Sequence, residues 1–101
     1  MDLAFHKILK EDFDIVLPLL QNLMNNQFSD RILKQRFSEM FDQNYECWGV
    51  YLDTKIIGVF GLWFMTRHYV GKSFEPDHVF IEKQHRGAGI GKRVFEWMYT
   101  Y

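Results

Sequence analysis

The stretch of sequence that decides the fold is HVFIEKQHRGAGIGKRVFEWM, residues 78–98. Its hydrophobic start, Val79–Ile81, predicts a strand, and the polar residues after it predict a short loop. Three glycines follow, at Gly87, Gly89 and Gly91. A helix is predicted from Gly89, because apolar residues recur at helical spacing at Ile90, Val94, Phe95 and Met98.

A strand, a glycine-rich loop and a helix N-terminus together favour anion binding. Glycines let the backbone approach a ligand closely, and the first N–H groups of a helix lack acceptors of their own. The helix dipole adds partial positive charge at the same point. Arg86 and Lys92 place full positive charges beside the loop, so we expect a ligand that contains phosphate.

The glycine spacing argues against two common nucleotide-binding motifs. A Walker A loop aligned on Gly91 and Lys92 would place Arg86 at its first glycine and Arg93 at its Ser/Thr position. A dinucleotide fingerprint, G-x-G-x-x-G, starting at Gly87 would need a glycine at Lys92. The spacing therefore disfavours a nucleotide-phosphate binder.

The sequence before this segment predicts three strands joined by short turns. Such turns make consecutive strands antiparallel neighbours. Gly58 and Gly61 lie inside the second strand and indicate a bulge or a close backbone approach. The strands are expected at residues 45–52, 56–66 and 73–83, with turns at 53–55 and 67–72.

The N-terminal part predicts one strand and two helices. Alternating apolar and polar residues suit a strand at Leu3–Leu9. The first helix is expected within residues 13–24, where Pro18 predicts either a kink or a later start. Ser29 is the expected N-cap of the second helix, which should end near Asn44.

The predicted order is therefore strand, helix, helix, three strands, helix, which is typical of an α+β (mixed α/β) domain. The loop matches the pattern Arg/Gln-x-x-Gly-x-Gly/Ala at Arg86, Gly89 and Gly91. In this pattern and in the order of its elements, the chain resembles the GNAT superfamily of acyl-CoA-dependent N-acetyltransferases. The resemblance implies a central, mainly antiparallel sheet flanked by helices. It also implies that residues 1–101 form a single C-terminally truncated domain, ending before the family's later strands and fourth helix.

The resemblance further implies that acetyl-CoA is the co-substrate and that a primary amine attacks the thioester directly. The pyrophosphate would lie on the loop and the pantetheine arm along the preceding strand, where a backbone amide would polarise the thioester oxygen. The residues that would bind acetyl-CoA are Val79, Phe80, Ile81, Arg86, Gly87, Ala88, Gly89, Ile90, Gly91 and Lys92.

An attacking amine must lose a proton, so a base near the loop is useful. The candidates lie on the strand before the loop: His78 first, then Asp77, with Glu75 weaker. His78 stands where many GNAT relatives carry an acidic residue. Strand alternation would place the Asp77 and His78 side chains on opposite faces, so that only one of them faces the reactants. A structural or solvated role is the competing interpretation for each residue.

The leading interpretation is thus an acetyltransferase that acts on a small-molecule or peptide amine. The alternative is a non-catalytic remnant or fragment that binds CoA weakly or serves as a self-associating module. The last strand would have an open edge, which favours a homo-oligomer. Turnover of acetyl-CoA with any amine distinguishes the two, and affinity for ATP or NAD above that for CoA would restore a nucleotide binder.

Composition limits other classes of function. Twelve Lys and Arg against thirteen Asp and Glu give a net charge of -1, which argues against a nucleic-acid partner. The longest apolar run, Ile56–Met65, is too short to cross a membrane. The single cysteine, Cys47, excludes an internal disulfide and fits a reducing, cytoplasmic location. His6 and His85 lack the spacing of metal ligands, so no metal is expected.

Overall fold

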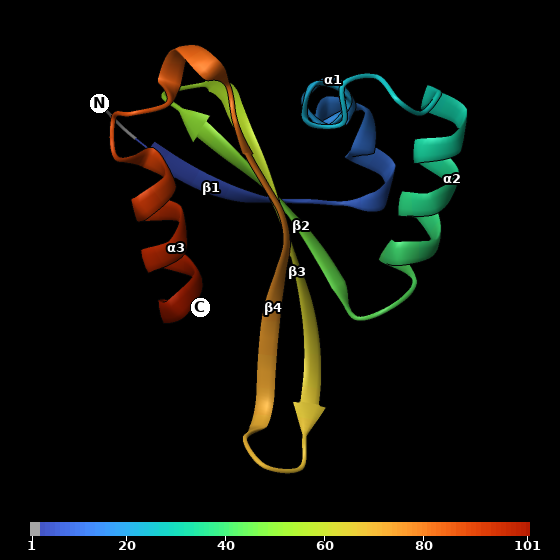
Figure 1. Cartoon of the computed structure of the whole chain (residues 1–101), viewed down its shortest axis with the longest axis vertical. Coiled ribbons are helices and arrows are strands. Elements are labelled where there is room, and N and C mark those ends of the chain that lie inside the picture. The colour runs from blue at the N-terminus through green and yellow to red at the C-terminus, as the bar shows by residue number, and fades with distance from the viewer. Residues whose placement is uncertain (1–2) are drawn as a thin grey trace.

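The computed structural model describes residues 3–101, which form a four-stranded sheet with helices on both faces (Figure 1). The sheet order is β1–β2–β3–β4, and every neighbouring pair is antiparallel. This arrangement confirms the predicted fold class and strand pairing. The elements are β1 (Leu3–Ile8), the 3-10 helix η1 (Lys10–Ile15), α1 (Leu17–Leu23), α2 (Asp30–Phe41), β2 (Tyr45–Leu52), β3 (Lys55–Arg67), β4 (Gly71–Ile81), the 3-10 helix η2 (Lys83–His85) and α3 (Ile90–Thr100).

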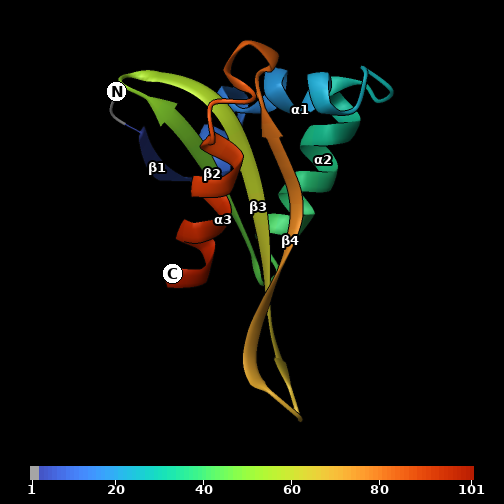
Figure 2. The same ribbon diagram turned by 60° about the vertical axis from the view of Figure 1, so that its left-hand side comes forward.

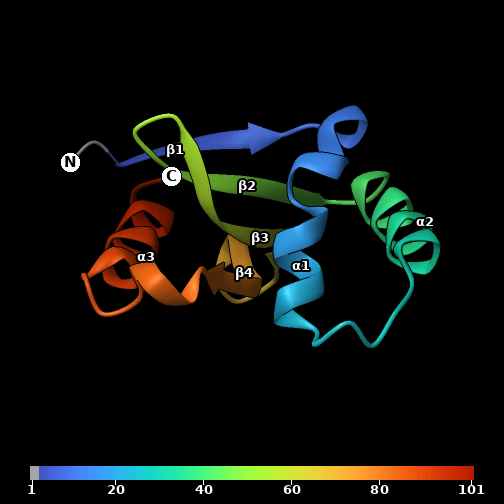
Figure 3. The ribbon, with the colours of Figure 1, turned by 90° about the horizontal axis from the view of Figure 1, so that it is seen from above.

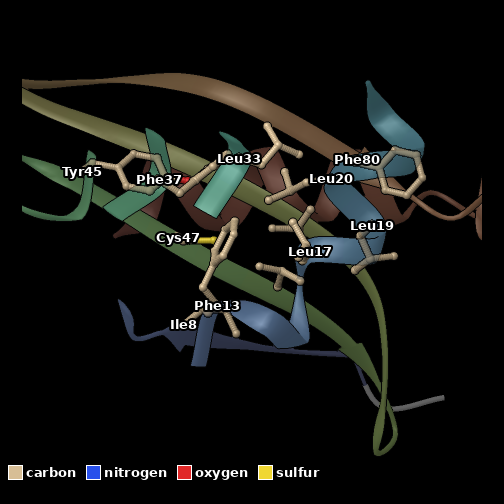
Figure 4. Close-up of a cluster of buried hydrophobic side chains, with 12 residues drawn as sticks. Ile8, Phe13, Leu17, Leu19, Leu20, Leu33, Phe37, Tyr45, Cys47 and Phe80 are labelled. Carbon is tan, nitrogen blue, oxygen red and sulfur yellow. The ribbon is translucent and has the colours of Figure 1, made fainter. Parts of the chain in front are cut away.

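Each face of the sheet has its own hydrophobic cluster. Helices α1 and α2 cover one face and α3 covers the other (Figure 3). On the α1/α2 face, Leu20 packs in the cluster that contains Cys47 (Figure 4). On the α3 face, Val94 packs in the cluster that contains Phe60. Strand β3 serves both clusters, because residues 57–62 are buried at every position whichever way they point.

Proline and serine set where the first two helices begin. Pro18 lies in the first turn of α1, where a missing N–H removes no helical hydrogen bond. Of the two alternatives predicted from Pro18, the later start of the helix is therefore correct and the kink within the helix is wrong. Ser29 caps α2 as predicted, since its hydroxyl oxygen accepts from the Ile32 N–H at 3.2 Å. Helix α2 ends at Phe41, earlier than the predicted Asn44.

The β3–β4 hairpin extends past the helices as a two-stranded arm (Figure 2). The turn between the strands is shorter than the predicted 67–72, and β4 spans 71–81 rather than 73–83. Gly71 has a φ of +75°, which lets the chain reverse within fewer residues. At the other end, the strand stops where residues 83–85 turn into η2.

Strand β4 lies at an edge of the sheet in the part of the chain that the structure describes. The Phe64 N–H bonds the Asn44 carbonyl on the β2 side, so even-numbered residues of β3 face β2. Pro76 pairs with Leu62 and therefore faces the open edge. Because proline has no N–H to offer a further strand, it blocks pairing along this part of the edge.

Candidate functional site

The loop before α3 has the geometry of an anion site. Gly89 is the N-cap of α3 with a left-handed φ of 78°, and no side chain in the described part of the chain caps the helix. A Cβ added at Gly87, Gly89 or Gly91 would meet no atom of the described residues within 4 Å. The first-turn N–H groups of α3 lack intrahelical acceptors, as they do in any helix. A ligand can therefore reach several backbone donors at the positive end of the helix dipole.

Arg86 joins this loop to β4. Its Nε donates to the Ile81 carbonyl at 2.7 Å, and its guanidinium carbon lies 5.3 Å from the centre of the Phe80 ring. Lys92 is exposed on the first turn of α3, with its Nζ 4.0 Å from a carboxylate oxygen of Glu96. Both cations thus lie at the loop, with Arg86 held against the strand and Lys92 exposed to solvent.

The backbone of β4 directs alternate N–H groups to the open edge. The Glu82 N–H bonds the Ile57 carbonyl at 2.8 Å, and the Phe80 carbonyl faces β3. In an antiparallel pair the backbone groups of successive residues point alternately toward and away from the partner strand. The N–H groups of Val79 and Ile81, on either side of Phe80, therefore point away from β3. An extended ligand beside β4 could bond these two groups, whereas the backbone of Phe80 is used within the sheet.

A cavity of about 250 Å³ adjoins the same region. Phe80, Glu82 and Arg86 line it together with Asn22 from α1. The cavity connects the end of β4 with the residues that precede the glycine loop. The predicted binding residues of the strand and of the loop therefore lie next to one another.

A β-bulge interrupts β4 just before this region. Phe60 pairs with Val79 and Leu62 with Pro76, so Asp77 and His78 together stand opposite one residue of β3, Gly61. Such a bulge breaks the alternation of side chains. Both side chains then contact residues on the α1/α2 face of the sheet, and the prediction that they point to opposite faces is wrong.

His78 is held by an aromatic cluster on that face. Its Nε2 lies 2.6 Å from the Tyr45 hydroxyl oxygen, and the centre of its ring lies 5.7 Å from that of Phe37. Figure 4 shows the Tyr45 and Phe37 rings side by side. Burial lowers the pKa of His78 to about 4, against the opposing effect of the Asp77 charge. Its Nδ1 is buried and has no hydrogen-bond partner among the described residues.

Asp77 is exposed and bonds the side chain of Trp63. Its Oδ2 accepts a hydrogen bond from the Trp63 Nε1 at 2.8 Å. The Trp63 ring packs in turn on Tyr45, with 5.1 Å between ring centres. The indole therefore fixes the Asp77 carboxylate at the bulge while leaving it open to solvent.

The match to known sequences agrees with this geometry. The family model described as an acetyltransferase (GNAT) domain matches residues 14–100. This protein belongs to the GNAT acetyltransferase family. No curated protein sequence matches the chain.

Solved structures of GNAT proteins share the fold. A ribosomal-protein-alanine N-acetyltransferase from Brucella melitensis has a TM-score of 0.81 at 19% identity, over 98% of this chain and 70% of its own. A GNAT family acetyltransferase from Staphylococcus aureus has a TM-score of 0.78 at 19% identity, over 99% and 77%. An aminoglycoside 6'-N-acetyltransferase from Acinetobacter baumannii has a TM-score of 0.78 at 14% identity, over 98% and 70%.

Two partners in this GNAT site were not predicted from the sequence. Tyr45 and Trp63 hold His78 and Asp77, respectively, from positions far away along the chain. The only signals in the sequence were the 18% aromatic content and Gly61. A Cβ on Gly61 would lie 2.7 Å from the Tyr45 Cε1 atom, so the small residue is what lets Tyr45 reach across β3.

Residues 3–101 of this GNAT domain contain neither a metal-binding cluster nor a membrane-spanning helix. No group of three or more His, Cys, Asp or Glu side chains is placed to hold a metal ion there. Nor is any helix in that range long and apolar enough to span a membrane.

Proposed function

We propose that this GNAT domain transfers the acetyl group of acetyl-CoA to a primary amine of a small molecule or peptide. The observation that carries the proposal is the continuity of two sets of unpaired backbone donors. The glycine loop offers the first N–H groups of α3, and the adjoining edge of β4 offers those of Val79 and Ile81. A ligand with a pyrophosphate at one end and an amide-containing arm at the other fits this order.

Acetyl-CoA supplies the acetyl group as a thioester when it is bound. The amides of Ile90, Gly91 and Lys92 would bind the pyrophosphate, and Lys92 would add a positive charge. The Val79 and Ile81 N–H groups would bond the arm as a further strand would. An outward amide beside the bulge would stabilise negative charge on the thioester oxygen. The new C–N bond forms as the C–S bond breaks, and the CoA thiolate leaves with a proton from solvent.

We assign the removal of the amine proton to Asp77, directly or through water. Its carboxylate is exposed and oriented by Trp63. His78, the first candidate from the sequence, is less suited to this step, because its Nε2 already contacts the Tyr45 hydroxyl and its buried ring disfavours protonation. We assign His78 a positioning role: with Tyr45 it fixes the bulge that presents Asp77.

The open edge of β4 supports a second candidate function. A domain that binds CoA weakly could instead use the same N–H groups to pair with another copy of itself. Pro76 limits this pairing to the part of the edge nearest the loop. The two candidates therefore compete for the same backbone donors.

Calorimetric titration of the full chain with acetyl-CoA tests the proposal. Gly89→Glu and Gly91→Glu each place a carboxylate where the pyrophosphate would lie, and Thr100→Glu places the same charge at the far end of α3 as a matched control. We expect binding by the wild type and by Thr100→Glu, and loss of binding in both glycine variants.

Thiol release from acetyl-CoA with a panel of amines then tests transfer. A folded protein that neither binds acetyl-CoA nor releases thiol with any amine would contradict the proposal and favour the self-associating module. Circular dichroism of each variant excludes unfolding as the cause of a loss.

A further inference from the structure

A groove lies on the α1/α2 side of the β3–β4 arm, where the arm passes the end of α2. Its volume is about 570 Å³, within the range of about 300–1,000 Å³ typical of small-molecule sites. Asp42 and Asn44, which follow α2, line one part of it, and Trp63 of β3 and Glu75 of β4 line another. Among residues 3–101, its lining contains two carboxylates and no lysine or arginine.

The end of α2 makes the groove more negative than these side chains alone would. Asp42 is the C-cap of α2, and the last turn of the helix contains no basic residue. The C-terminus of a helix carries partial negative charge, so a carboxylate there is unfavourable for the helix itself. A cation bound at this point would be attracted by both the carboxylate and the helix end.

Both carboxylates have partners outside the groove. Lys10 Nζ donates to both carboxylate oxygens of Asp42, at 3.0 and 3.3 Å, and Arg67 bonds Glu75 along the arm. All four side chains are substantially exposed, and such pairs contribute little energy. A carboxylate also accepts more than one donor. Each carboxylate oxygen therefore keeps capacity for a second donor, and a ligand ammonium can bind without displacing Lys10 or Arg67.

Trp63 connects the groove to the proposed reaction site. Trp63 is one of the residues that line the groove, and its Nε1 donates to Asp77 at 2.8 Å. An ammonium group over an indole face is favoured by the ring quadrupole. A ligand that extends along this ring would have one end near Asp77 and the other near Asp42 or Glu75.

From this arrangement we infer that the acceptor is a diamine or polyamine, held in the groove by an ammonium group that does not react. That ammonium lies between the end of α2 and the arm, against Asp42, Glu75 and the Trp63 ring. The amine at the other end lies beside Asp77 and is the one that is acetylated. The inference rests on the proposed function for the identity of the reacting end, but the binding of the cation does not depend on it.

The test compares diamines with monoamines of the same length. The pairs are 1,4-diaminobutane with butylamine and 1,6-diaminohexane with hexylamine, each with acetyl-CoA and the full chain. We expect kcat/KM for the better diamine to exceed that for its monoamine about tenfold, as two exposed charge contacts would give. The double variant Asp42→Asn/Glu75→Gln should reduce this ratio to about one to two. Glu39→Gln, which removes an exposed charge on α2 outside the groove lining, should keep the wild-type ratio.

A binding measurement separates this inference from the proposed function. The indole N–H signal of Trp63 in the nuclear magnetic resonance spectrum, assigned with Trp63→Phe, should shift with 1,4-diaminobutane in the wild type and not in the double variant. If that shift occurs and no amine is acetylated, the groove binds diamines and the proposed function is wrong. If amines are acetylated with no preference for diamines, or with a preference that the double variant keeps, the groove assignment is wrong.

Discussion

The hydroxyl oxygen of Tyr45, the first residue of β2, lies 2.6 Å from the Nε2 of His78 in the bulge of β4. Burial raises the pKa of Tyr45 far above its usual value, so the hydroxyl keeps its proton. Burial also lowers the pKa of His78 to about 4, so the imidazole is neutral at pH 7. The short distance between the atoms suits a hydroxyl that donates to a neutral ring nitrogen. The bulge is thus fixed by an uncharged contact between β2 and β4.

This contact predicts a stability that depends on the protonation of His78. The pKa of His78 is about 4 in the folded protein and about 6.5 when unfolded, so the unfolded state binds the proton first as the pH falls. The free energy of unfolding should therefore be highest above pH 6.5 and decrease as the pH falls from 6.5 through 4, by a total of about 3 kcal/mol. Urea denaturation across this range measures the decrease.

Two histidine variants control that experiment. His78→Gln should remove most of the decrease, whereas His68→Gln, an exposed residue on the arm, should keep it. A decrease of equal size in wild type and His78→Gln would show that another group causes it.

Gly91→Glu should separate folding from acetyl-CoA binding. Gly91 lies in the first turn of α3, its φ is not positive, and an added Cβ meets no described atom within 4 Å. Glutamate is a better helix former than glycine and suits a helix N-terminus, so it should preserve or raise the free energy of unfolding, by up to about 1 kcal/mol. Its carboxylate would occupy the path of a pyrophosphate and repel it, so we expect affinity for acetyl-CoA to fall about tenfold or more. Transfer from S-acetyl-pantetheine, which has no pyrophosphate, should be unchanged, and an equal loss with both donors would contradict the loop assignment.

Trp63→Phe should slow acetyl transfer without weakening acetyl-CoA binding. The substitution keeps a ring on β3 but removes the N–H that orients Asp77 at 2.8 Å. We expect kcat to fall about tenfold, with the KM for acetyl-CoA unchanged. Trp48→Phe is the matched control, since the Trp48 Nε1 donates to Glu46, away from the bulge. A similar decrease of kcat in both variants would show that Asp77 does not take part in the reaction.

Self-association through β4 should compete with acetyl-CoA. Both would use the Val79 and Ile81 N–H groups, while Pro76 leaves the rest of the edge unsuitable. Sedimentation velocity should show a mass that rises with protein concentration and returns to that of the monomer when acetyl-CoA is added. Pro76→Thr restores an outward N–H and should strengthen the association. Dimers that persist at saturating acetyl-CoA would have to use another surface.

The sequence predicted those elements of the fold that local chemistry determines. Pro18 and Ser29 set the starts of α1 and α2 through backbone hydrogen bonding within one turn, and the hairpin order follows from short turns. The boundaries of β4 were displaced because strand ends depend on the partner strand. Helical spacing from Ile90 onward correctly predicted α3, and Ile90, Val94 and Met98 lie against one face of the sheet. Phe95, which the spacing also placed on the apolar side, is exposed.

The candidate site was predictable only in its local part. The glycine loop is contiguous in sequence, and its open geometry follows from its composition. The bulge at Asp77 and His78 depends on pairing with β3. The regular alternation of side chains along a strand therefore predicted the wrong face of the sheet for one of these two side chains. Tyr45 and Trp63 reach the bulge through contacts between separate strands, which no local pattern in one sequence encodes.

The reaction of Cys47 with a labelling reagent can report on local opening of the protein at the centre of the sheet. The side chain is 0% exposed, and burial raises the pKa of its thiol to about 12, so a labelling reagent meets almost no thiolate while the chain is folded. The thiol can then be modified only when α1 and α2 separate from the sheet. The rate of modification therefore measures how often these helices separate from it, and any ligand that stabilises their contact with the sheet will lengthen the labelling half-life.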